Sequence, residues 1–281
     1  MPEEYRIKRF GRLPAPRSIR DFTPETPAIT RLLGSEPKAT TATTVDLRSN
    51  CTPIRDQQDL GACVAFACCG LVEYYQKKVK KDYLQMSPLF VYKLARHMLG
   101  WEGDTGLFIK SGMSALAHFG SPKESDWPYD PPAFEEMPPW TVGAIAQNYQ
   151  ALKYFRLDAY PYSKPESILA RIKSYLAAGN PSVFGFSCFE SLFDDNTGDI
   201  AFPSQSENLI GGHSVVTVGY DDNLQVKGAK TRGALLIRNS WGTGWGRQGY
   251  GFLPYDYVLQ GLADEFWVLT SAEWLDAAKF E

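Results

Sequence analysis

Three residues of the types that act together in nucleophilic catalysis stand far apart in this chain: Cys63, His213 and Asn239. A nucleophilic thiol needs a base within hydrogen-bond reach, and the base needs a third group that orients its ring. Cys63 follows Gly61 and opens an apolar, helix-prone run, so we expect it in the first turn of a helix. The helix dipole favours an anion there, which predicts a lowered pKa for the thiol.

The two candidate partners of the thiol lie beside patterns typical of buried strands. His213 follows two glycines and begins a β-branched run, and Asn239 follows the strand-like run 234–238. Such wide separation agrees with residues that meet only in the folded chain. The alternative for Cys63 alone is a buried small hydrophobe, which is the commoner fate of a cysteine.

Several motifs in this order resemble the papain-like cysteine peptidases from Val45 to about Trp267. The resemblance rests on Val45-Asp46-Leu47-Arg48, Gln57 six residues before Cys63, Gly61-Ala62-Cys63-Val64-Ala65-Phe66, Gly212-His213-Ser214-Val215 with Gly219-Tyr220, and Asn239-Ser240-Trp241-Gly242-Thr243-Gly244-Trp245-Gly246. One such motif would be weak evidence, but an ordered set is specific. The resemblance implies a Cys63–His213–Asn239 site.

The same resemblance implies roles for residues around that site. Gln57 would stabilise the oxyanion, and Trp241 would shield the histidine–asparagine hydrogen bond from water. Gly106, Leu107 and Gly212, together with Trp241, would line the substrate groove. Three departures from the family pattern are Leu60 in place of a disulfide cysteine, Val64 in place of tryptophan, and Gly212 in place of an acidic residue or asparagine. They leave the specificity open but remove no catalytic group.

The order of elements, helices first and strands second, predicts an α+β fold. By resemblance it would have two lobes, a helical lobe at about 45–160 and a β-rich, barrel-like lobe at about 161–281, with the active site in the cleft between. Helices are expected at 63–81, 88–98, 107–119 and 165–179, with strands at 182–187 and near 265–269.

Residues 1–44 are rich in proline and are expected to be extended or irregular, without a core of their own. One interpretation is a flexible tail. The other follows from the resemblance, in which a preceding segment crosses the groove and restrains the enzyme. A leader as short as this one is typical of bacterial relatives. We therefore expect part of residues 5–35 to pack near the groove.

Charge and composition narrow the function classes. The net charge of −3 gives no electrostatic reason to expect a nucleic-acid partner, and no apolar stretch is long enough to span a bilayer. His97 and His118 lack partners at metal-ligand spacing, so no metal or cofactor is expected. We expect a monomer with largely reduced cysteines, although a Cys51 bridge stays open. The charged first residues predict a cytoplasmic protein or export without a cleavable signal peptide.

The sequence therefore predicts a cysteine peptidase that hydrolyses peptide bonds through a thiolate–imidazolium pair and an acyl-enzyme, with endopeptidase cleavage expected. Two alternatives remain: an acyltransferase of transglutaminase type, and a non-catalytic peptide-binding protein on the same fold. The glutamine before Cys63 and the block at 239–246 favour the peptidase.

Overall fold

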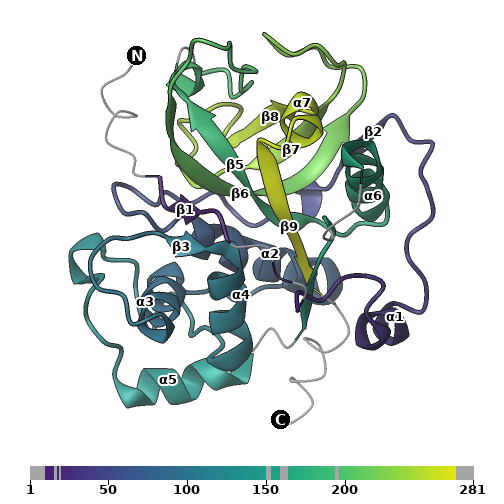
Figure 1. Cartoon of the computed structure of the whole chain (residues 1–281). Coiled ribbons are helices and arrows are strands. Elements are labelled where there is room, and N and C mark those ends of the chain that lie inside the picture. The colour runs from purple at the N-terminus through teal and green to yellow at the C-terminus, as the bar shows by residue number, and fades with distance from the viewer. Residues whose placement is uncertain are drawn as a thin grey trace.

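Helix α2 (Cys63–Lys80) lies between a group of helices and a large antiparallel sheet in the computed structural model (Figure 1). The structure describes residues 10–15, 18, 20–149, 153–158, 164–193 and 196–269. Fourteen consecutive residues of α2, Cys63 to Gln76, are buried. A helix that is apolar all round is a core helix, and this one packs on helices and strands alike.

The helical lobe is completed by α3 (Pro88–Met98), α4 (Ile109–His118) and α5 (Trp140–Ala146). The predicted start of α3 is confirmed: Ser87 Oγ accepts a hydrogen bond of 3.2 Å from the Phe90 N–H, and Pro88 occupies the first turn. The helix expected over 107–119 begins later, because Leu107 and Phe108 form the short strand β3 (Leu107–Phe108). The sequence did not predict α5, which directly follows the prolines of residues 128–139.

The second lobe is a seven-stranded sheet in the order β4-β9-β5-β6-β7-β8, with β2 pairing with β6 off this path. Its strands are β2 (Thr44–Asp46), β4 (Tyr154–Arg156), β5 (Ser182–Phe189), β6 (Leu209–Asp221), β7 (Ala234–Arg238), β8 (Tyr250–Pro254) and β9 (Ala263–Leu269). Helices α6 (Pro165–Ala177) and α7 (Asp256–Leu259) pack on its far side (Figure 1).

This architecture confirms the α+β prediction, but the lobes are not continuous in sequence. Strands β2 and β4 pair with β6 and β9, although both fall in the range expected for the helical lobe. The division of the chain into domains stays a prediction. No helix among the described residues is long and apolar enough to cross a membrane.

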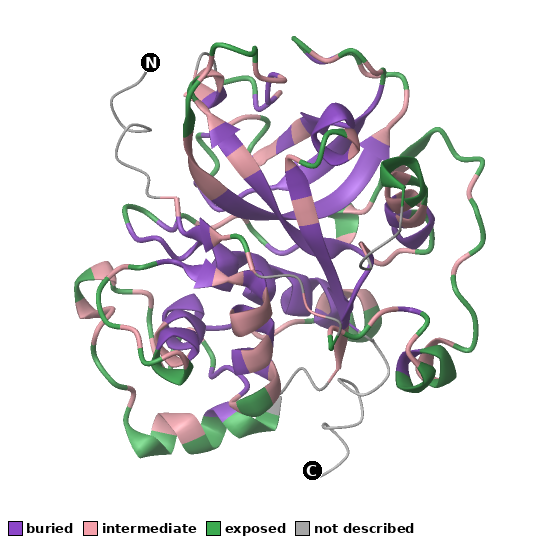
Figure 2. Cartoon of the chain, viewed as in Figure 1, coloured by how far each residue is buried: buried purple, intermediate pink, exposed green. Residues whose placement is uncertain are grey.

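The N-terminal segment is more ordered than the sequence predicts. It contains the short strand β1 (Arg12–Leu13) and a helix, α1 (Pro27–Leu33), whose Ile29 is fully buried. The Pro27 ring fits the first turn, which explains how a proline-rich stretch still forms a helix. Figure 2 shows that β1 lies among buried residues, whereas α1 exposes most of its surface.

The buried carboxylate of Glu73 ties α2 to the loop that leads to Gln57. It is 1% exposed and accepts hydrogen bonds from Thr52 Oγ1 (2.7 Å), Arg55 (2.9 Å) and the Met86 N–H (2.9 Å). Removing one partner of a buried ion pair leaves the other charge uncompensated.

Replacing Glu73 with alanine is therefore expected to lower the free energy of unfolding by roughly 3 kcal/mol. Urea denaturation measures the change, with Glu136→Ala as the exposed control. Equal stability of the two variants would contradict this role for Glu73.

Candidate active site

Cys63 is the first residue of α2 and is fully buried. The chain before it is fixed by Asp104, whose Oδ1 accepts a 3.0 Å hydrogen bond from the Gly61 N–H. The Tyr92 hydroxyl donates to the same oxygen at 2.5 Å. The helix start expected from the sequence is thus confirmed, and a contact from the loop before β3 holds it.

His213 and Asn239 come together through the pairing of β6 with β7. The two strands are antiparallel, and Val216 faces Arg238, so Asn239 falls diagonally across from His213. Diagonal neighbours of this kind lie within reach of each other's side chains. The His213 Nε2–H donates a 2.7 Å hydrogen bond to Asn239 Oδ1, and both residues are buried.

This hydrogen bond fixes the tautomer of the imidazole. Asn239 Oδ1 also accepts a 2.8 Å hydrogen bond from the Ser240 N–H, which orients the amide with its oxygen toward the ring. His213 therefore carries its proton on Nε2 when neutral, and Nδ1 is the basic nitrogen. The Ser214 N–H, next in the chain, points at the Cys63 sulfur. Cys63 and the histidine strand thus meet across the groove.

Trp241 covers the histidine–asparagine pair. Its ring centroid lies 4.6 Å from that of His213, and the Trp245 ring abuts it edge-on at 5.7 Å. Only 2% of Trp241 is exposed. A hydrogen bond kept away from water is electrostatically stronger, so these rings reinforce the orientation of His213.

Gln57 is held with its amide in a defined orientation. Its Oε1 accepts a 2.7 Å hydrogen bond from the Ser240 hydroxyl, and its Nε2 donates to the Leu60 carbonyl at 2.9 Å. The backbone of Gln57 also pairs with Ser240, through a 2.8 Å N–H to carbonyl bond. Ser240 thus links Gln57 to Asn239, which directly follows β7.

Residues 10–13 of the N-terminal segment occupy the space between the lobes. On the helical side, strand β1 runs parallel to β3, and the Gly11 carbonyl accepts a 2.7 Å hydrogen bond from the Leu107 N–H. On the sheet side, a side chain added at Gly211 or Gly212 would collide with Phe10 or Arg12. The main chains approach this closely only because glycines line the groove.

The segment also touches the candidate catalytic residues. The Gly11 N–H points at the Cys63 sulfur. The Phe10 ring lies 6.3 Å from His213 and 6.2 Å from Trp241, centroid to centroid. This contact agrees with the expectation that part of residues 5–35 packs near the groove, although residues 5–9, 16, 17 and 19 lie outside the described part of the chain.

The predicted lowering of the Cys63 pKa is wrong for this state of the protein. Burial removes the sulfur from water and raises the pKa to about 11, outweighing the opposite effect of the N–H groups of Ser214, Gly11 and Val64. The N-terminus of α2 favours the thiolate, but its effect on the pKa is smaller than the effect of excluding water from the groove. Cys63 is therefore a neutral thiol at pH 7 while the segment is in place.

The four residues predicted to bind substrate all lie at this groove. Gly106 and Leu107 contact Gly11, Gly212 contacts Arg12, and Trp241 packs against His213. Their roles toward a substrate stay predictions, as do those of the catalytic residues. Sequence reasoning missed Arg12, Asp264 and Glu265, which meet on the sheet side of the groove. No local motif marks them.

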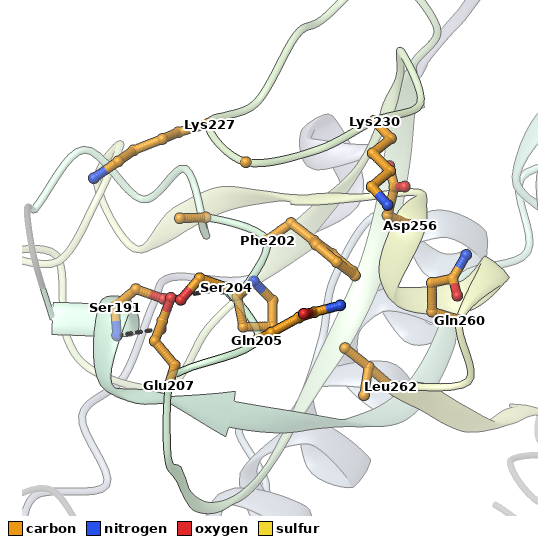
Figure 3. Close-up of a pocket in the computed structure, with 13 residues that line it drawn as sticks. Ser191, Phe202, Ser204, Gln205, Glu207, Lys227, Lys230, Asp256, Gln260 and Leu262 are labelled. Carbon is orange, nitrogen blue, oxygen red and sulfur yellow. Dashed lines mark hydrogen bonds between the residues drawn. The ribbon is translucent and has the colours of Figure 1, made fainter.

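A hollow of about 650 Å³ lies on the sheet lobe (Figure 3). Phe202, Lys230 and Gln260 are among its lining residues. One wall is built by Glu207, which accepts hydrogen bonds from the Ser191 and Ser204 N–H groups at 3.0 and 2.8 Å. It contains none of the residues predicted for catalysis.

The described residues form neither a metal site nor a disulfide bond. No group of three or more His, Cys, Asp or Glu side chains that could hold a metal ion occurs among the described residues. All five cysteines are free, so the open alternative of a Cys51 bridge does not apply in this structure.

Comparison with known proteins identifies the family of this chain. The sequence profile described as "Papain family cysteine protease" matches residues 41–262. The chain belongs to this family. An uncharacterized peptidase C1-like protein of Acanthamoeba polyphaga mimivirus is 33% identical over 220 residues, which cover 76% of this chain and 68% of the viral protein. A cathepsin L-like proteinase of Fasciola hepatica is 26% identical and is matched over 55% of its length.

Solved structures of papain-family enzymes agree in fold. Xylellain, a cysteine protease from Xylella fastidiosa, has a TM-score of 0.73 and 31% identity, with 92% of this chain and 95% of xylellain covered. Bromelain from Ananas comosus, solved with the inhibitor E64, has a TM-score of 0.61 at 20% identity and supports the fold alone. Several other curated relatives are matched over only about two-fifths of their length, for example 40% of a Theileria parva cysteine proteinase.

Uncovering the groove is expected to lower the pKa of Cys63 in this papain-family protein. Arg12→Glu in the full chain places a negative charge beside Asp264 and Glu265 and should expel the segment. The alkylation rate of Cys63 should then have a midpoint near or below the ordinary thiol value of about 8.5, compared with about 11 in the intact protein. Iodoacetamide labelling read by mass spectrometry measures both midpoints.

A Cys63→Ser variant serves as the control, because it reports labelling of the four other buried cysteines. An unchanged midpoint in the Arg12→Glu variant would show that residues 10–13 do not set the pKa.

Proposed function

We propose that this papain-family cysteine peptidase is latent, with Cys63, His213, Asn239 and Gln57 as its catalytic residues and residues 10–13 as the groove-filling inhibitor. The observation that carries the assignment is the His213–Asn239 hydrogen bond beneath Trp241, at a groove that also reaches Cys63. Each required type of group is present in one place, and the same groove accepts an extended peptide, because residues 10–13 lie in it.

Catalysis begins with transfer of the thiol proton to His213 Nδ1. The resulting Cys63 thiolate attacks the scissile carbonyl carbon and forms a carbon–sulfur bond. The imidazolium gives its proton to the leaving amine as the carbon–nitrogen bond breaks, which leaves a thioester. Water then attacks the thioester with His213 as base, releasing the acid and regenerating the thiol. Asn239 holds the Nε2–H throughout, so Nδ1 stays directed at the reacting atoms.

The negative charge that develops on the carbonyl oxygen needs fixed donors. The Cys63 N–H at the start of α2 and the Gln57 amide supply them, and Ser240 keeps the amide in place before the reaction starts. Preorganised donors of this kind stabilise the transition state more than the ground state.

The two alternative functions differ from hydrolysis in observable ways. An acyltransferase would pass the acyl group from Cys63 to an added amine, whereas a peptidase passes it to water. A non-catalytic peptide binder would release no product. Peptide substrates follow from the family, whereas a monomeric state, endopeptidase cleavage, and action away from nucleic acid and membranes stay predictions.

Opening the groove is expected to raise peptidase activity. The full-length Arg12→Glu variant should cleave a mixture of fluorogenic peptides at least about tenfold faster than the intact protein, because burial no longer keeps Cys63 protonated. Adding Cys63→Ala to it should abolish turnover, and adding Cys51→Ala, a cysteine outside the groove, should not. Turnover that survives Cys63→Ala would exclude the proposed chemistry.

Loss of the amide at position 57 is expected to affect kcat more than KM. In the Arg12→Glu protein, Gln57→Ala should lower kcat by roughly 10²–10³-fold, because one oxyanion donor is lost. Steady-state kinetics on a single peptide separates the two constants, and Ser240→Ala should give a smaller decrease of the same kind. A rise in KM alone would assign Gln57 to substrate binding.

A further inference from the structure

Arg12 extends from the groove-filling segment into a pocket on the sheet lobe, the acidic pocket, formed by Gly185, Gly212, Asp264 and Glu265. The Arg12 guanidinium donates to Glu265 Oε1 at 2.7 Å and forms a second ion pair with Asp264. Arg12 is 6% exposed and Glu265 is 1% exposed. The arginine is thus taken into the protein along its whole length.

The pocket is complementary to an arginine side chain in shape as well as in charge. Gly185 lies opposite Asp264 in the pairing of β5 with β9. A Cβ added at Gly185 would collide with the Arg12 stem and its Nε. Any other residue at position 185 would therefore close the path that the long side chain follows. On the groove side, the Gly212 main chain contacts the Arg12 backbone in the same way.

The acidic pocket is held by contacts that do not involve Arg12. Glu265 has a positive φ of 59°, a conformation that is strained for a residue with a side chain. The Asp158 carboxylate accepts hydrogen bonds from the Glu265 and Phe266 N–H groups, both at 2.9 Å, and Arg156 binds Asp158 at 2.7 and 2.9 Å. This network maintains the strained backbone at Glu265, inside β9, and keeps its side chain directed inward.

Arg12 does not use all the acceptors that the pocket offers. Among the described residues, Glu265 Oε2 accepts no hydrogen bond and Arg12 Nε donates none, although both atoms are buried. A guanidinium placed slightly differently could bind Glu265 through two parallel hydrogen bonds, which are stronger and more specific than one. Burial raises the pKa of both Asp264 and Glu265, and a cation in the pocket opposes that rise.

The pocket lies close to the reacting centre. Gly11, the residue before Arg12, directs its N–H at the Cys63 sulfur. Consecutive Cα atoms are about 3.8 Å apart, so a side chain that fills the pocket belongs to a residue within one or two positions of the one at Cys63.

We propose that Asp264 and Glu265 make the acidic pocket of this peptidase select substrates with an arginine within two residues of the bond that is cleaved. The inference rests on the proposed function, because it assumes that a substrate replaces residues 10–13 in the groove. In the latent protein Arg12 fills the site as an internal mimic of that side chain. Asp264 and Glu265 act by binding the substrate and take no part in the chemical steps.

The first experiment compares two peptides that differ only in the charge of one side chain. The full-length Arg12→Glu variant is offered a peptide library in which each position carries either arginine or citrulline, which has the same shape but no charge. We expect one position within two residues of the cut to favour arginine by at least tenfold in kcat/KM. Equal cleavage of the two peptides, or a preference only at distant positions, would overturn the proposal.

The second experiment tests by mutation whether Glu265 causes the preference for arginine. Adding Glu265→Gln to the Arg12→Glu protein should reduce the arginine-to-citrulline ratio at least tenfold, chiefly through KM for the arginine peptide, while citrulline peptides are still cleaved. Glu166→Gln, which removes one exposed carboxylate in the first turn of α6, is the matched control and should keep the ratio. A ratio that survives Glu265→Gln would show that Arg12 and Glu265 form only a structural latch.

A binding measurement separates this inference from the proposed function. Calorimetry on the full-length Cys63→Ala, Arg12→Glu protein should show tighter binding of the arginine peptide than of its citrulline counterpart. Preferential binding without turnover in the Cys63-containing protein would overturn the peptidase assignment and support the pocket. Turnover without preferential binding would support the peptidase assignment and overturn the proposal for the pocket.

Discussion

The hydrogen bond between His213 Nε2 and Asn239 Oδ1 is the interaction on which the rest of this site depends. It decides which imidazole nitrogen is basic, and therefore on which side of the ring a proton can be exchanged with Cys63. Its geometry follows from the register of two buried strands, and its strength follows from the cover that Trp241 provides. A shift of one residue in that register would turn one of the two side chains to the opposite face of the sheet.

The same groove accounts for both the proposed chemistry and the proposed latency. Under the proposed function, a peptide substrate would approach the main chain of both lobes closely, which the glycines at Gly106 and Gly212 allow. Those glycines admit residues 10–13 equally well. Once the segment is seated, water is excluded from Cys63, and burial raises its pKa despite the favourable start of α2. Inhibition of this kind would need no distortion of the proposed catalytic residues, because filling the groove and excluding water would be sufficient.

The sequence predicts well what is encoded by neighbouring residues. The start of α2 at Cys63 and the N-cap at Ser87 each depend on a few adjacent residues, and both occur in the structure. What could not be predicted depends on contacts across the whole chain. Arg12 meets Glu265 across 253 positions, and the positive φ of Glu265 is set by Asp158, which belongs to another segment. The predicted direction of the Cys63 pKa shift is wrong for the same reason, since burial depends on the folded groove.

An inhibitor that is part of the chain must be held firmly enough to stay and loosely enough to leave. The local concentration of a tethered segment is high, so even a modest intrinsic affinity keeps the groove filled. The hydrogen bonds of Arg12 fit that requirement, because they leave Glu265 Oε2 without a donor among the described residues. A substrate that satisfies this acceptor gains an interaction that the segment lacks. Latency and selectivity would then have one physical origin, the charge and shape of the pocket that Arg12 occupies.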